Sequence, residues 1–443
     1  MSEADNLKEL GVVEDPDQSS MGRRIEWMSR RQTLITIILF AFCNIILIMF
    51  MIFSPPLFIT QIKEFTSNID SSASNKFQFK FKNLKYFNSF ITLDLRFNQT
   101  YYDVYQPNDT HPVKLLTSGN FKIGNTIIDT IPINAREYNI TFNKDVNMSD
   151  KLRLLAKGYI NFDTIDYSVA ITQPPGYNLP GEFIWNFAEP SYSILLFFLR
   201  LVFCILSIFI YIRLLLSDAK YDKSNIIIKM VFHLSLLLVF ACDPFFILAY
   251  LTQTPFFNLF DICLSFFTFT YTAFVALISL SMRNLRYRDY SKIWIIFHYL
   301  PFFATFIFFT INSSFNVIQV NKDPMSKVTP LFLGFGILKF VVAGVYLLSI
   351  VIHIFLFKTD IPNEKPAYSL MSLIFFITVL CCELYNVLNP YLGTDSAAQS
   401  FTLIATAIYI FFYLFINWPV EPSEITNPDV EAPLDPSIQI VNE

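Results

Sequence analysis

The stretch ACDPFFILAYLTQTPFFNLFDICLSFF, residues 241–267, is almost entirely apolar, yet it carries one carboxylate near each end, Asp243 and Asp261. A mostly apolar run of 18 or more residues is long enough to cross a membrane as a helix. This stretch contains the end of one such run, a short loop and the start of the next. It therefore predicts two neighbouring antiparallel membrane helices, each with an acid near the same side of the bilayer.

The composition of the whole chain agrees with a membrane protein. Of its 443 residues, 53% are hydrophobic, only 15% are charged, and 50 are phenylalanine. Soluble domains contain about 25% charged residues. We expect eight membrane spans, at about 33–53, 191–215, 225–249, 257–282, 293–313, 329–357, 368–389 and 399–417.

The arginines and lysines predict the orientation. Arg23, Arg24, Arg30 and Arg31 precede the first span, and positive charge normally stays on the cytoplasmic side. The short loops then alternate between basic and poorly basic, which places both termini in the cytoplasm. The first span has a long charged leader and no small-residue cleavage site, which favours an uncleaved signal anchor.

Residues 59–190, between the first and second spans, are predicted to form a lumenal antiparallel β-sandwich. KFQFKFK (76–82) and FITLDLRF (90–97) alternate between apolar and polar residues, which is typical of half-buried strands. YNITF (138–142) and YINFDTIDYSVAI (159–171) repeat the pattern. Turn-forming residues at 106–109, 118–120 and 174–181 separate the expected strands.

The same segment carries four sequons for N-glycosylation, which begin at Asn98, Asn108, Asn139 and Asn147. Their clustering in the segment already assigned to the lumen supports that assignment. The six cysteines all lie within predicted spans, so we expect a lumenal domain without disulfides. No cysteine or histidine spacing suggests a metal site, and we expect no cofactor and no nucleic-acid partner.

Five ionisable residues lie inside the predicted spans, in the half nearer the lumen: Arg200, Asp243, Asp261, Lys339 and Glu383. Such groups cost about 2.5–3.5 kcal/mol each on insertion scales and normally face the interior of a bundle. Two interpretations stay open. They form buried ion pairs, such as Arg200 with Asp243 and Lys339 with Glu383, or they line a polar cavity that opens to the lumen.

Three histidines, His233, His298 and His353, lie in the cytoplasmic half of separate predicted spans. Together they would suit a membrane zinc hydrolase, but no paired histidine and no carboxylate lie at that depth. We therefore expect interfacial histidines that bond to the backbone or to lipid headgroups, and a protein that is not an enzyme.

One span, a β-rich lumenal domain and seven further spans is an unusual order. With DPFFILAY (243–250), FDICLSFFTFTYTAFVALISLSM (260–282) and YSKIWIIFHYLPFF (290–303), it resembles the Wntless-like proteins of the GOLD-domain seven-transmembrane group. The similarity is greatest to the transmembrane protein 181 branch. The resemblance implies a lumenal domain docked on a receptor-like bundle that acts in secretory-pathway traffic.

The sequence thus divides into a cytoplasmic segment (1–32), a signal anchor (33–54), a lumenal GOLD-like domain (59–190), a seven-helix bundle (191–417) and a disordered acidic tail (418–443). We expect a non-enzymatic receptor in the Golgi, endosome or plasma membrane, with membrane lipids around it. Its lumenal cargo would be a protein or a lipidated ligand, and its cytoplasmic loops would engage trafficking machinery. A ligand-activated signalling receptor is the alternative, and a zinc hydrolase is the third.

Overall fold

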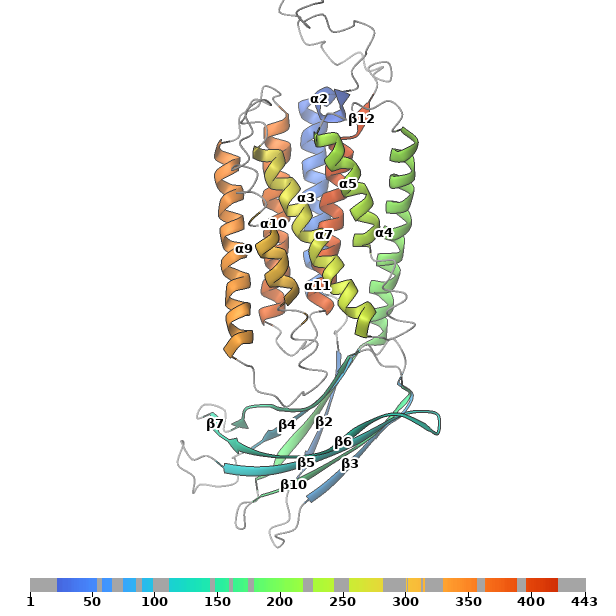
Figure 1. The fold of residues 1–443 in the computed structure, drawn as a ribbon, viewed down its shortest axis with the longest axis vertical. Coiled ribbons are helices and arrows are strands. Elements are labelled where there is room, and N and C mark those ends of the chain that lie inside the picture. Colours follow the sequence, from blue (N-terminus) through green and yellow to red (C-terminus); the bar gives the residue numbers. More distant parts are fainter. Residues whose placement is uncertain are drawn as a thin grey trace, which may run out of the picture.

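The computed structural model describes residues 22–53, 58–65, 75–84, 90–98, 111–143, 148–158, 162–173, 179–217, 226–242, 255–281, 300, 302–311, 314, 330–356, 363–388 and 396–420. A layer of helices stands on a β-sandwich, and the short strands β1 (Gly22–Arg23) and β12 (Pro419–Val420) lie at the end of the helices farthest from the sandwich (Figure 1).

The sandwich consists of two four-stranded antiparallel sheets, which confirms antiparallel β-structure between the first two predicted spans. One sheet has the order β3 (Asn75–Phe81), β10 (Thr164–Thr172), β5 (His111–Ile123), β6 (Thr126–Ile140). The other has the order β2 (Phe58–Phe65), β11 (Gly181–Ala188), β4 (Phe90–Phe97), β9 (Leu152–Gly158). A two-residue pair, β7 (Phe142–Asn143) and β8 (Met148–Ser149), lies beside them.

Period-two alternation builds the core between these sheets. On β4, Ile91, Leu93, Leu95 and Phe97 are fully buried, and they meet the aromatic residues of β3 and β11. Trp185 of β11 contributes the largest buried side chain of this core. β4 is also buried on its other face, where Arg153 Nε donates to Asp94 Oδ1 at 3.0 Å.

The turn predicted at residues 118–120 is wrong, because these residues lie inside β5 and the register towards β6 shifts there. Gly119 faces the ring of Tyr167, and a Cβ at this position would meet Tyr167 Cδ2 at 2.7 Å. The glycine therefore serves close packing rather than chain reversal. The reversal comes at Gly124, whose φ of 58° is readily adopted by glycine. The strand predicted from residue 159 begins at Thr164.

The helices lie where the hydropathy pattern predicts spans: α3 (Arg30–Phe53), α4 (Pro190–Ser217), α5 (Ile226–Ala241), α7 (Pro255–Ser281), the segment Phe302–Ile311, α9 (Pro330–Leu356), α10 (Glu364–Leu388) and α11 (Ser396–Ile416). Within the described residues, four are long and apolar enough to cross a membrane, namely those in α3, α4, α7 and α10. Shorter apolar stretches of 10–17 described residues lie at Lys229–Phe240, Phe302–Ile311, Phe340–Leu356 and Phe401–Ile416. The protein is therefore an integral membrane protein, and the number of spans stays a prediction.

Helix α3 packs with one face against α10 and α11, and its opposite face is exposed. Phe40 of α3 is fully buried and makes edge-to-face contacts with Tyr409 and Phe412 of α11. The hydroxyls of Ser279 and Tyr413, 2.7 Å apart, join α7 to α11. Aromatic packing and a few polar pairs thus hold the central helices together.

Two paired strands connect the sandwich to these helices. β2 follows α3, and β11 leads into α4 with only Glu189 between them. The two strands are antiparallel neighbours from Phe58–Ala188 to Phe65–Gly181. Because both strands belong to one hydrogen-bonded ladder, the sandwich is fixed directly to the ends of two helices.

Candidate functional site

A cavity of about 140 Å³ lies between α7, the segment 302–311, α9 and α10. Its walls are almost wholly aromatic and aliphatic. They are formed by Phe269, Thr270, Ala273, Phe302, Thr305, Phe309, Phe340, Ala343, Gly344, Tyr346, Leu347, Phe376, Val379 and Leu380. Apolar cavities of about 150 Å³ stay dry and take up small hydrocarbons.

The cavity lies near the middle of the helices that form it. Its lining residues on α9 lie between Phe340 and Leu347 and those on α10 between Phe376 and Leu380, far from both ends of those helices. In a membrane this position corresponds to the hydrocarbon interior rather than the headgroup layer. The depth and the lining together favour the hydrocarbon part of a ligand.

One polar atom in the wall lacks a partner. Tyr346 is 4% exposed, and its hydroxyl makes no hydrogen bond to any described residue. Leaving a buried hydroxyl unsatisfied costs about 1–3 kcal/mol. A ligand with a carbonyl, ester or hydroxyl group at this point would remove that cost, so the cavity is suited to an apolar chain with a polar group.

The cavity opens on the outer surface of the bundle, beside α9. Phe340 and Leu380 at its rim are 47% and 53% exposed. Among the described side chains of α9, only Tyr346 and Ile350 are buried. Helix α9 therefore covers the cavity as a peripheral wall, and a lipid chain has access from the membrane side.

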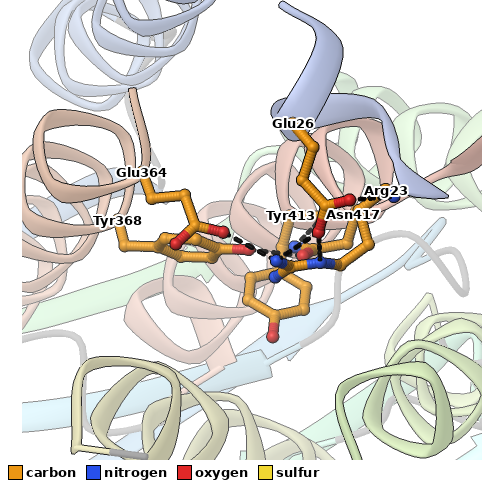
Figure 2. A network of polar contacts seen from close by, with 6 residues as sticks. All are labelled: Arg23, Glu26, Glu364, Tyr368, Tyr413 and Asn417. Atoms are coloured by element: carbon orange, nitrogen blue, oxygen red, sulfur yellow. Dashed lines mark hydrogen bonds and ion pairs between the residues drawn. The ribbon is translucent and has the colours of Figure 1, made fainter. Parts of the chain in front are cut away.

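A second polar feature, here called the terminal clasp, lies at the opposite end from the sandwich and comprises Arg23, Glu26, Glu364, Tyr368 and Asn417 (Figure 2). Arg23 is the centre of it. Its Nη2 is 2.5 Å from Glu26 Oε1 and 2.8 Å from Glu364 Oε1. The Glu364 side chain is 1% exposed, whereas that of Glu26 is 31% exposed.

Backbone pairing reinforces the clasp. β1 pairs with β12, and Arg24 N donates to Trp418 O at 2.8 Å. Tyr368 of α10 donates its hydroxyl to Asn417 at the end of α11 (Figure 2). The clasp thus joins the segment before α3 to the start of α10 and the end of α11.

The structure places the predicted charged residues only in part. Arg200 lies on α4 and is buried, with 5% of its surface exposed. The backbone positions of Asp261, Lys339 and Glu383 fall in α7, α9 and α10, but their side chains and all of Asp243 lie outside the described residues. The ion pairs and the polar cavity predicted for these residues stay predictions.

The histidines make local contacts where they are described. His233 Nδ1 is 3.0 Å from the Tyr271 hydroxyl, and His353 Nδ1 is 2.6 Å from the Ser349 carbonyl one turn earlier. His298 lies outside the described residues. In the described part of the chain, no three metal-ligating side chains gather, and none of the six cysteines forms a disulfide.

Two of the four sequon asparagines are described. Asn139 is exposed on β6, and Asn98 is half-buried beside the end of β4. Asn108 and Asn147 lie outside the described residues. Asn139 is therefore the best-presented acceptor among those described.

The chain matches the Wntless-like transmembrane domain family over residues 189–421, more than half of its length. It belongs to this family. No curated protein matches it significantly. Membership confirms the Wntless-like group and indicates a role in membrane trafficking or transport, while the transmembrane protein 181 branch and the GOLD-like domain stay predictions.

Sequence reasoning missed both the apolar cavity and the clasp of this Wntless-like protein. The tyrosine at 346 looked like any aromatic residue of a membrane helix, and its missing partner becomes visible only once four helices are packed. Arg23 was interpreted through topology alone. The sole sequence signal for the clasp was Glu364, an acid at the start of an apolar run.

Proposed function

We propose that this Wntless-like protein is a non-enzymatic cargo receptor of the secretory pathway whose bundle holds the hydrocarbon chain of a lipid or lipid-bearing cargo. The observation that carries the proposal is the apolar cavity at mid-depth with the unpartnered Tyr346 hydroxyl in its wall. The family match supports the trafficking role.

The predicted orientation would give the two ends of the protein different roles. The sandwich would lie in the lumen, where Asn139 is exposed for glycosylation. Both described ends of the chain lie at the opposite end of the bundle (Figure 1), next to the basic residues that precede α3. In this arrangement the sandwich meets the soluble part of a cargo, and the clasp end faces cytoplasmic trafficking machinery.

The proposal is tested by photolabelling the full-length protein in detergent micelles with a long-chain fatty acid that carries a diazirine. Cross-links are mapped to peptides by mass spectrometry. We expect labels on α7, α9 and α10, and several-fold less labelling in Ala343→Phe, because the new ring fills the cavity. The matched control is Val345→Phe on the same helix, since Val345 is 54% exposed and lies outside the lining.

Equal labelling of both variants and the wild type would contradict the cavity as the binding site. Lipid co-purification identifies the natural occupant, and the same preparation separates the competing functions. Ligand-stimulated coupling to a G protein would favour the signalling receptor. Zinc bound at one equivalent, with hydrolysis of a lipid, would favour the hydrolase.

A further inference from the structure

The outer face of the sheet β3-β10-β5-β6 points away from the helices, because this sheet forms the layer of the sandwich farther from the bundle (Figure 1). Its core-facing residues include Ile165, Tyr167, Val169 and Ile171 of β10. The alternate residues of β10 therefore lie on the outer face, and the strand pairing identifies their neighbours on β3 and β5.

Three small side chains, Ser118, Ser168 and Ala170, lie in the middle of this outer face. Ser168 lies between Gln78 and Ser118, and Ala170 lies between Lys76 and Leu116. The hydroxyls of Ser118 and Ser168 are 2.6 Å apart and satisfy each other. Leu116 is 39% exposed, so the floor offers a small apolar contact beside polar ones.

Lysines surround this floor, here called the lysine-rimmed face: Lys76 and Lys80 on β3, and Lys114 and Lys122 near the two ends of β5. Lys76 and Lys80 are about 13 Å apart along their strand, and neighbouring strands are about 4.8 Å apart. Because β10 lies between β3 and β5, the lysines of these two strands are about 10 Å apart across the sheet. An extended peptide segment fits between them, and carboxylates on its alternate residues can reach the lysines.

Two carboxylates form ion pairs with lysines of the rim. Asp166 lies between Lys80, whose Nζ is 3.6 Å away, and Lys122, which donates a hydrogen bond to it. That hydrogen bond lowers the pKa of Asp166, so the carboxylate stays ionised at neutral pH. Glu137 of β6 is 3.2 Å from Lys114. The lysines outnumber these acids, although the whole chain has a formal net charge of −4.

We infer that the lysine-rimmed face is a docking surface for an acidic protein segment that lies across the sheet. The inference extends the proposed cargo receptor by naming the chemistry of the soluble partner, and it does not depend on the apolar cavity. Carboxylates of the segment pair with the rim, and small apolar side chains contact Leu116 and Ala170.

The pattern favours an acidic protein over a sulfated polysaccharide. A polysaccharide with evenly spaced sulfates is best matched by an uninterrupted row of basic residues. On the lysine-rimmed face, Asp166 and Glu137 lie beside the lysines and interrupt the positive charge. The exposed Leu116 and the nearly buried Ala170 give an apolar contact that a protein side chain can fill. Discrete charges around a small apolar floor are the complement of an acidic peptide.

The test uses the full-length protein in detergent micelles and a short fluorescent peptide of alternating Glu and Ala, with its Gln–Ala counterpart as the neutral control. Binding is followed by fluorescence anisotropy at low and at physiological salt. We expect the acidic peptide to bind and the neutral one not to bind. The double variant Lys76→Glu/Lys114→Glu should weaken binding by about tenfold or more at low salt, since each reversal turns an attraction into a repulsion.

The matched control is Lys151→Glu/Lys365→Glu, which changes the net charge equally at two exposed positions outside this sheet, one directly before β9 and one on α10. It should leave binding within about twofold, and melting temperatures verify that both variants are folded. Equal loss in the two double variants would show attraction by net charge alone and overturn the inference. So would tight binding of heparin without binding of the acidic peptide, or the absence of peptide binding to the wild type.

Discussion

Replacing Arg23 by methionine is expected to destabilise the protein far more than removing the nearer of its two carboxylates. Arg23 Nη2 contacts Glu26 at 2.5 Å and Glu364 at 2.8 Å, but only Glu364 is buried, with 1% of its side chain exposed. Breaking a buried ion pair from one side costs about 3–5 kcal/mol, because the remaining charge is left in a poorly solvated place. Exposed pairs contribute about 0–1 kcal/mol.

The three changes at the clasp should therefore differ in a defined order. Arg23→Met should cost about 3–5 kcal/mol of the free energy of unfolding. Glu364→Gln should cost less, because the guanidinium keeps Glu26. Glu26→Gln should cost about 1 kcal/mol or less. The double variant Arg23→Met/Glu364→Leu should recover most of the loss, because it leaves neither charge buried.

The measurement is a reversible denaturant titration in detergent micelles followed by tryptophan fluorescence. Trp27 and Trp418 lie beside the clasp and report its opening directly. The reasoning is refuted if Arg23→Met costs no more than Glu26→Gln, or if the double variant is less stable than Arg23→Met alone. Either result would mean that burial of Glu364 does not decide the energetics of this contact.

Four further outcomes are expected. Tyr346→Phe should stabilise the lipid-free protein by about 1 kcal/mol or more in the same titration, since it removes an unsatisfied buried hydroxyl. A loss of stability would mean that the hydroxyl makes a hydrogen bond in the folded protein. Gly119→Ala should cost about 1–3 kcal/mol because its Cβ would lie 2.7 Å from a tyrosine ring. Gly334→Ala, which meets nothing within 4 Å, should be neutral or stabilising. Asn139→Gln should remove one glycosidase-sensitive step in electrophoretic mobility, and an unchanged pattern would show that this sequon is unused.

The sandwich and the clasp join different helices at the two ends of the bundle. At one end, α3 and α4 are linked through the β2–β11 ladder. At the other end, α3 is held to α10 and α11 by the clasp. Helix α9 takes part in neither attachment among the described residues, which agrees with its role as the peripheral wall of the cavity.

Local pattern located the helices but only part of the β-structure, since no strand was predicted at β2, β5, β9 or β11. Apolar runs located the helices, and alternation in KFQFKFK and FITLDLRF located β3 and β4 with the correct residues facing the core. These features depend on near neighbours in the chain, and the side-chain periods of helix and strand translate directly into sequence. The pattern was misleading at residues 118–120, where the glycine answers a packing demand from Tyr167 on another strand.

The sequence by itself determined that the protein lies in a membrane, carries a β-rich domain between its first two apolar segments, and resembles the Wntless-like family. Only the tertiary structure decided where the terminal clasp and the apolar cavity lie. Arg23 and Glu364 are 341 residues apart in the chain, and the cavity is lined by residues of four separate helical segments. Contacts of that range leave no periodic trace in a single sequence, because they arise only when packing brings distant side chains to the same depth.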